Sequence, residues 1–139
     1  MYETIIEEAK SIFARAAETV EGRYALEGHD EDYQFKLKDA HSFYVSIQGG
    51  KLIVASGDTP KTGYFECTYI ETDSQTLREL FSGKLRPVEA IEQRRFNMLI
   101  RMYEGCQITI LLRICGELIR KSFLERATTD QILATVNKL

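Results

Sequence analysis

The spacing of apolar residues changes its period near residue 30, and this change constrains the fold more than any other feature of the chain. From Thr4 to Val20, apolar residues recur at intervals of three and four, which is typical of an amphipathic helix. From Tyr33 to Lys38, apolar and polar residues alternate, which is typical of a strand with one face toward water. A chain with both periods predicts an α+β domain in which helices cover one face of a sheet.

The first helix is expected to occupy residues 1–22. Glu7 and Glu8 lie in its first turn, where the positive end of the helix dipole favours carboxylates. Gly22 is expected to end this helix in the left-handed conformation, because glycine adopts a positive φ angle without steric cost.

Three more strands are predicted after the first. The runs Phe43–Gln48 and Lys51–Ala55 flank Gly49 and Gly50, and two glycines can adopt the positive φ angles of a tight hairpin turn. The aromatic and β-branched run Tyr64–Glu71 follows a segment rich in turn formers. Because the strands follow one another through short connections, we expect an antiparallel, meander-like order.

Two short helices are predicted next. The segment Thr72–Gln75 has the hydroxyl and amide spacing of a capping box, and the helix that it opens is expected to end at Gly83. Pro87 suits the first turn of the second helix, because its fixed φ angle is helical and the N–H that it lacks would have no partner there.

The C-terminal third of the chain combines both periods. Phe96, Met98 and Ile100 alternate like a strand, whereas the apolar residues between 108 and 119 have helical spacing. We therefore predict a fifth strand followed by a helix. A further capping-box pattern at 128–131 predicts a C-terminal helix, placed at 125–139. The length of the chain favours one domain over residues 1–139.

Charge and hydropathy exclude several classes of partner. The net charge is -3 and the isoelectric point about 5.5, which disfavours binding to nucleic acid. Apolar runs such as Ile108–Leu112 are far shorter than the roughly 20 residues of a membrane span. The acidic N-terminus is unlike a signal peptide. We therefore expect no stable membrane insertion and a cytoplasmic, prokaryotic location.

Cysteine and histidine spacing indicates neither a disulfide framework nor a metal site. Cys67, Cys106 and Cys115 form no CxxC pair, and their odd number favours reduced core residues. His29 and His41 have no second histidine or cysteine at ligand spacing. The chain also lacks the common nucleotide-binding and hydrolase motifs, so we predict no cofactor, no metal and no catalytic residue.

The stretch from Asp73 to Ala90 resembles the signature region of the sterol carrier protein family, also called the SCP-2 sterol-transfer domain. It contains a capped helix that ends in Leu80-Phe81, followed by small-Gly-Lys-Leu-x-Pro-x-x-Ala at the family's spacing. Upstream, 33–39 and 43–51 resemble the family's first strands, including the glycine turn followed by lysine. The resemblance covers about the middle half of the chain. After Ala90 the family usually continues with glycines, which 94–100 lacks.

This resemblance implies a five-stranded, mostly antiparallel sheet with helices packed on one face, enclosing an apolar tunnel. It implies non-catalytic binding and carriage of a sterol, fatty acid or fatty acyl-CoA in that tunnel. We expect the wall to come from the two short helices and the C-terminal strand and helix, although the same residues would also suit an ordinary core. The predicted wall residues are Phe81, Ile91, Phe96, Met98, Met102, Ile108 and Leu112.

Three arginines are candidates for the mouth of the tunnel. Arg94, Arg95 and Arg101 lie close together in the sequence, and a guanidinium offers forked donors to a lipid carboxylate or a CoA phosphate. The alternative is a solvated rim on a strand edge, which would discourage pairing with the edge of another sheet.

Two other classes of function stay open at this point. One is a dimeric protein-interaction scaffold with a filled core, in which a terminal helix offers its apolar face to a second copy. The other is a small isomerase-type enzyme with His29, Asp30 or Asp32 as general base beside an apolar wall. The ending Asn137–Leu139 resembles the peroxisomal address, which makes the peroxisome the alternative location.

Overall fold

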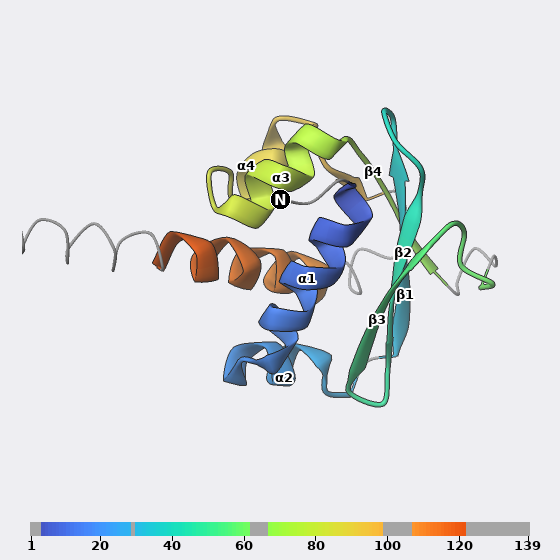
Figure 1. Ribbon diagram of the computed structural model, residues 1–139, viewed down its shortest axis with the longest axis vertical. Helices are drawn as coiled ribbons and strands as arrows, with labels where there is room; N and C mark the ends of the chain where they lie inside the picture. Colours follow the sequence, from blue (N-terminus) through green and yellow to red (C-terminus); the bar gives the residue numbers. More distant parts are fainter. Residues whose placement is uncertain (1–3, 29, 62–66, 99–106, 122–139) are drawn as a thin grey trace, which may run out of the picture.

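The period-two segments form a five-stranded sheet, and the helices of the described residues lie on one face of it (Figure 1). The computed structural model describes residues 4–28, 30–61, 67–98 and 107–121. The strands have the spatial order β3-β2-β1-β4-β5. Their bounds are β1 Glu31–Leu37, β2 Phe43–Gln48, β3 Lys51–Ser56, β4 Cys67–Thr72 and β5 Asn97–Met98. The predicted α+β class and the five-stranded, mostly antiparallel sheet are confirmed.

The order of the strands differs from the predicted meander. β1 pairs with β2, β2 with β3 and β4 with β5 in antiparallel fashion, but β4 runs parallel to β1. The connection after β3 is held on β1, because the Thr59 backbone N–H donates to Gln34 Oε1 at 2.7 Å and the Thr59 hydroxyl donates to Asp32. β4 therefore pairs with β1 on the side opposite to β2. The hairpin turn itself is as predicted, with positive φ angles at Gly49 and Gly50.

The N-terminal helix is divided, which corrects the prediction of one helix over 1–22. α1 covers Ile5–Glu18 and α2 covers Val20–Leu26. Thr19 between them is extended, and its hydroxyl donates to Ala16 O and accepts from the Gly22 N–H. Gly22 therefore lies inside α2 and not at a left-handed terminus. Glycine is needed there because a Cβ atom would lie 1.9 Å from Ala16 O.

The two short helices occur as predicted, with one change at the first cap. α3 covers Ser74–Ser82 and ends at Gly83 in the left-handed conformation, and α4 covers Pro87–Glu92 with proline at its start. The residue that caps α3 is Asp73, whose carboxylate accepts from the Thr76 N–H at 2.7 Å. Thr72 instead belongs to β4, and its hydroxyl donates to Arg95 O.

Residues 107–121 are helical and complete the layer that covers the sheet. This 107–121 helix contains the predicted apolar spacing from Ile108 to Ile119. Tyr33 on β1 fastens it to the sheet, because its hydroxyl donates to Gln107 Oε1 at 2.7 Å. None of the helices in the described segments is long and apolar enough to cross a membrane. The C-terminal helix predicted at 125–139 lies outside the described residues.

The core lies between the sheet and the helices that cover it, and aromatic side chains fill much of it. Phe35 is fully buried, stacks on Phe43 with 4.7 Å between ring centroids, and meets Phe96 edge to face at 6.3 Å. Phe13 from α1 meets Phe81 from α3 edge to face at 5.6 Å. Because these side chains pack against one another, the tunnel predicted between the sheet and the helices stays a prediction.

Cys67 and Cys115 are buried free cysteines, as predicted, and Cys106 lies outside the described residues. Cys115 faces α1, with Sγ 3.8 Å from Ile12 O. Burial raises the pKa of the Cys115 thiol to about 12, because a thiolate would be poorly solvated there.

Candidate functional site

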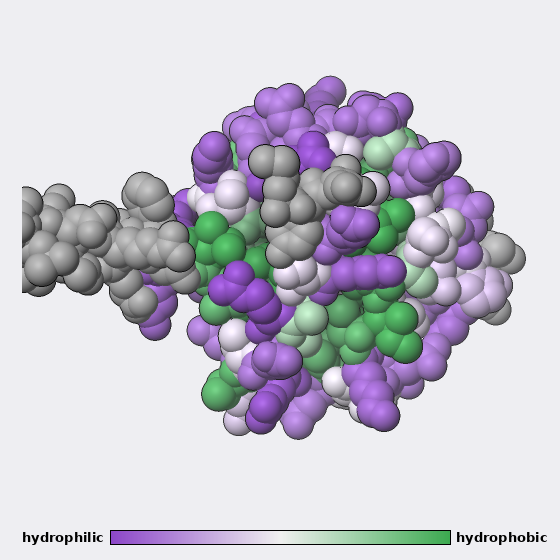
Figure 2. Space-filling model, viewed as in Figure 1, coloured by the Kyte–Doolittle hydropathy of each residue, from purple (hydrophilic) through white to green (hydrophobic). Residues whose placement is uncertain are grey.

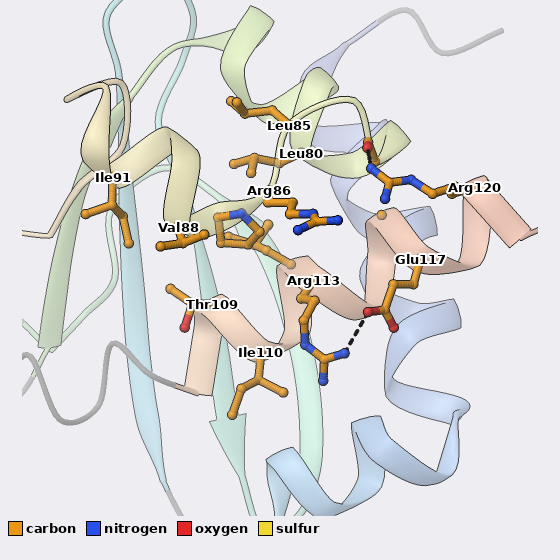
Figure 3. Close-up of a pocket in the computed structure, with 14 residues that line it drawn as sticks. Leu80, Leu85, Arg86, Val88, Ile91, Thr109, Ile110, Arg113, Glu117 and Arg120 are labelled. Carbon is orange, nitrogen blue, oxygen red and sulfur yellow. Dashed lines mark hydrogen bonds and ion pairs between the residues drawn. The ribbon is translucent and has the colours of Figure 1, made fainter.

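A mostly apolar hollow of about 490 Å³ lies between α3, α4 and the 107–121 helix (Figure 3). We call it the helix groove. Buried Leu80, Leu85 and Leu112 contribute apolar side chains to it. Val88 and Ile110 also line it and are 57% and 39% exposed, so the hollow is open to solvent. The complete lining is Leu80, Gly83, Leu85, Arg86, Pro87, Val88, Ile91, Thr109, Ile110, Leu112, Arg113, Gly116, Glu117 and Arg120.

Two glycines set the approach of α3 to the 107–121 helix at one end of the groove. A Cβ atom on Gly83 would lie 2.5 Å from Gly116 O, and one on Gly116 would lie 2.9 Å from Leu80 O. Gly83 also has a φ angle of 78°, which allows the chain to turn sharply out of α3 toward α4. The close contact and the turn together shape the groove, because they fix where α4 begins.

The groove has one apolar end and one charged end. Figure 3 shows Val88 and Ile91 toward one side and Glu117 and Arg120 toward the other, with Arg86 between them. Figure 2 shows the wider setting, in which apolar surface, coloured green, gathers in patches among hydrophilic residues. A site of this form suits an amphiphile, because a tail and a head group need different surroundings.

The arginines at the charged end have different partners. Arg113 donates to Glu117 Oε1 at 2.8 Å and to Glu21 Oε2 at 3.0 Å, and these two carboxylates raise its pKa. Arg120 donates to the Gly83 carbonyl. Arg86 is exposed, and among the described residues its guanidinium forms no ion pair. The positive charge of Arg113 is therefore compensated within the protein, whereas that of Arg86 is not.

Ile91 and Leu112 are the predicted wall residues that line the helix groove. Phe81 lines a smaller cleft of about 160 Å³ between α1, α3 and the 107–121 helix. Phe96 and Ile108 are buried in the core, and Met98 is half-buried and packed against it. Met102 lies outside the described residues. The described part of the predicted wall is thus spread over the groove, the cleft and the core.

The arginines predicted for the mouth do not line the helix groove where they are described. Arg95 forms an ion pair with Glu79 and donates from Nε to Thr76 Oγ1 at 3.2 Å, which ties α3 to the turn after α4. Arg94 is exposed and has a positive φ angle of 59°. Arg101 lies outside the described residues.

Sequence reasoning missed Val88, Ile110 and the arginines of the groove. Ile110 could have been recognised as a surface residue of interest, because it is apolar but lies outside the buried apolar stripe of its helix. Arg113, Glu117 and Arg120 are spaced by four and three residues, so they share one face of the helix. A search for apolar residues off the buried stripe, next to such a charged face, would have indicated this surface.

The acidic residues considered as general bases lie away from the groove. Asp32 is buried on β1, where its carboxylate accepts from the hydroxyls of Ser46 and Thr59, with Lys61 Nζ at 3.7 Å. Asp30 is exposed and accepts from the Gly49 N–H. His29 lies outside the described residues. The contacts of Asp32 hold the connection after β3 on the sheet, which is a structural role.

No family model and no curated protein sequence matches the chain. Solved structures do match in fold. The sterol carrier protein domain 2 of Helicoverpa armigera has a TM-score of 0.61 at 20% identity, over 79% of this chain and 86% of that one. A protein described as "UbiJ-SCP2 Ubiquinone synthesis protein" has a TM-score of 0.62 at 9% identity, over 80% and 95%. The chain therefore has the fold of sterol carrier protein 2 domains.

A third match is to part of a much larger protein. The inverting sec-alkylsulfatase Pisa1 from Pseudomonas sp. has a TM-score of 0.53 at 16% identity, over 66% of this chain. The chain spans only 14% of the length of that sulfatase. At this identity the match concerns the fold, which thus occurs both as most of a small protein and as a minor part of an enzyme.

Proposed function

We propose that the chain binds and carries an apolar or amphiphilic lipid, namely a sterol, a fatty acid or a fatty acyl-CoA, without catalysing a reaction on it. One observation carries this proposal: a mostly apolar groove of about 490 Å³, open to solvent, in a fold shared with sterol carrier protein 2 domains. The volume falls within the roughly 300–1,000 Å³ that is usual for small-molecule sites.

The energetics of an alkyl chain in this groove support micromolar binding. Burial of one methylene contributes about 0.8 kcal/mol, so roughly ten methylenes contribute about 8 kcal/mol before the cost of immobilisation. A dissociation constant near 1 μM corresponds to about 8 kcal/mol, so an alkyl chain must bury more than about ten methylenes to offset that cost and reach micromolar affinity. No polar anchor is required for binding of this strength.

The exposed apolar side chains of the groove also support a ligand. Val88, Ile91 and Ile110 are 57%, 38% and 39% exposed, and they lie around one hollow. Single exposed apolar residues are common on proteins, but a group around a concavity is typical of a surface that is covered in use. A bound alkyl chain would remove these three side chains from water.

A displacement experiment with a fluorescent fatty-acid probe tests the proposal. Val88→Asp places a charge in the apolar end of the groove and should weaken probe binding about tenfold or more, because the carboxylate would have to lose water. Ile53→Asp is the matched control, since Ile53 is 61% exposed on the sheet face that the helices leave uncovered. It should leave the affinity for the probe unchanged.

Met98→Trp distinguishes ligand binding in the helix groove from ligand binding in the predicted tunnel. Met98 packs against the core at the edge of the sheet, so a tryptophan there should obstruct a tunnel but not the groove. Weaker binding in Met98→Trp, with normal binding in Val88→Asp, would place the ligand against the sheet. A wild-type chain that binds no probe, sterol or acyl chain would overturn the proposal as a whole.

A homodimer is the second candidate, and the surface of α2 favours it. Val20 and Tyr24 are 71% and 73% exposed, and both lie on this short helix. A second copy could cover them. Sedimentation equilibrium of the wild type and of Tyr24→Ser tests this, and a dimer that Tyr24→Ser dissociates would support it.

The proposed place of action is the cytoplasm, with the peroxisome as the alternative.

A further inference from the structure

We infer that the helix groove selects amphiphiles with an anionic head group, and that Arg86 contacts the anion. This inference rests on the proposed lipid-carrying function and names the ligand class for the same site. The structure places the Arg86 guanidinium over the groove, between the end of α3 and the 107–121 helix (Figure 3).

The first argument is the charge of the lining. Three arginines and one glutamate line the groove, so its own ionisable side chains leave it positive. Arg113 is neutralised by Glu117 and by Glu21 from α2. Arg120 donates to a backbone carbonyl, which carries no full charge. Arg86 and Arg120 are both exposed, and neither forms an ion pair with the described residues. Of the two, Arg86 is the better candidate for a ligand, because the Arg120 guanidinium already donates to Gly83 O.

The second argument is that this positive end contrasts with the rest of the chain. The whole protein has a formal charge of -3, so the three arginines around this groove are not a consequence of general basicity. The apolar walls from Leu80 and Leu85 lower the local dielectric, which strengthens the attraction between a guanidinium and an anion. A guanidinium also presents forked donors that match a carboxylate or a phosphate.

The third argument is the direction that the groove gives to a ligand. The apolar end formed by Val88 and Ile91 accepts an alkyl tail, and Arg86 lies between that end and Glu117. A fatty carboxylate or an alkyl phosphate satisfies both ends at once. A sterol has a single neutral hydroxyl, so it would leave the guanidinium without a counter-charge. The groove therefore favours an anionic amphiphile over a neutral one.

Calorimetric titration with three ligands of equal chain length tests this inference. Dodecanoate, dodecyl phosphate and dodecanol share one tail and differ in the head group, and each is used below its aggregation limit. The wild type should bind at least one of the anions about tenfold more tightly than dodecanol. Comparison of the carboxylate with the phosphate then shows which head group the site prefers.

Two variants locate the selectivity. Arg86→Gln should reduce the affinity for the anions about tenfold, and should reduce the affinity for dodecanol much less, because dodecanol carries no charge. Lys84→Gln is the matched control, because Lys84 is exposed, lies two residues away and does not line the groove. It removes the same charge and should preserve the preference for the anion. Equal losses in the two variants would indicate a long-range field and overturn direct contact by Arg86.

The outcomes separate this inference from the proposed function. Equal affinity of the wild type for dodecanol and both anions would overturn the inference and support lipid binding. Failure of all three ligands to bind would overturn the inference, and failure of the fluorescent probe and of sterols as well would overturn the proposed function. A tight dimer that excludes all three ligands would show a second copy in the groove and would contradict both.

Discussion

The interface between α1 and the sheet differs from the helix groove in how completely its apolar side chains are covered. At the interface, Phe13, Phe35 and Phe43 are fully buried and contact other rings. At the groove, Val88 and Ile110 keep much of their surface in water. Buried area stabilises the folded chain, whereas exposed apolar area is available to a ligand. The difference indicates that the interface stabilises the fold, whereas the proposed binding depends on the groove.

The 107–121 helix belongs to both regions. One of its faces carries Ile108, Leu111 and Cys115, which are fully buried in the core. The groove side carries Ile110 and Arg113, which reach solvent. Changes on the two sides should therefore have different consequences, on folding for the first and on binding for the second.

The largest expected effect is that of Phe35→Ala. Phe35 is fully buried and contacts two other rings, so its truncation should reduce the free energy of unfolding by about 3–5 kcal/mol. Val88→Ala in the groove should change it by less than about 0.5 kcal/mol. Urea denaturation measures both. Similar losses in the two variants would show that the groove is part of the stabilising core.

Gly83→Ala tests the contact that forms the end of the groove. Gly83 and Gly50 have φ angles of 78° and 77°, but only at Gly83 would a Cβ atom collide, 2.5 Å from Gly116 O. Gly50→Ala should cost about 1 kcal/mol from backbone strain, and Gly83→Ala about 2 kcal/mol or more because the helices must also separate. Equal losses, measured by thermal unfolding, would mean that the helix contact adds nothing.

Asp73→Ala should lower the free energy of unfolding by about 1 kcal/mol, because α3 loses its N-terminal cap. α3 contributes both to the core and to the groove, so this loss is expected to affect folding and binding together. Asp58→Ala is the control, since Asp58 is an exposed loop carboxylate paired with Lys36. Denaturation of the two variants side by side measures the difference. No loss in Asp73→Ala would contradict the cap.

Asp39→Ala should have the smallest effect, and that effect should depend on pH. The Ser74 backbone N–H donates to Asp39 at 3.0 Å and lowers the pKa of that carboxyl. A carboxylate whose pKa is lowered by folding stabilises the protein above its unfolded value of 3.8 and loses that contribution as the pH falls through the folded pKa.

The difference in unfolding free energy between wild type and Asp39→Ala should thus be below about 1 kcal/mol at pH 7. It should be unchanged at pH 5 and shrink below pH 3.8. Urea denaturation at these pH values measures it. A difference that grows on acidification would give the wrong sign and contradict the role of the Ser74 hydrogen bond.

Local features of the fold could be predicted because their causes are local. The glycine pair of the hairpin, the left-handed Gly83 and the proline that begins α4 all act through the conformation of one or two residues. The parallel pairing of β1 with β4 could not be predicted in this way. This pairing occurs together with a contact between Asp32 and Thr59, which are distant in sequence. The alternation of apolar and polar residues predicts a strand, but it does not predict which other strand pairs with it.

The candidate site was only partly predictable. The resemblance around 73–90 indicated the right fold, and Ile91 and Leu112 do line the groove. Arg86 was within the recognised stretch, but nothing in its spacing distinguished it from the other arginines of the chain. Its significance depends on which cations already have a carboxylate partner, and those partners come from other helices, as Glu21 on α2 does for Arg113.

The sequence by itself determined the kinds of elements, most of their ends and the α+β class, because hydrophobic period, caps and turn glycines act within a few residues. Only the tertiary structure decided which faces meet and which stay open. Gly83 and Gly116 illustrate the reason, since each glycine is needed because of the backbone of the other helix. A hydrophobic pattern shows that a side chain avoids water, but whether protein or ligand covers it depends on the arrangement of distant segments.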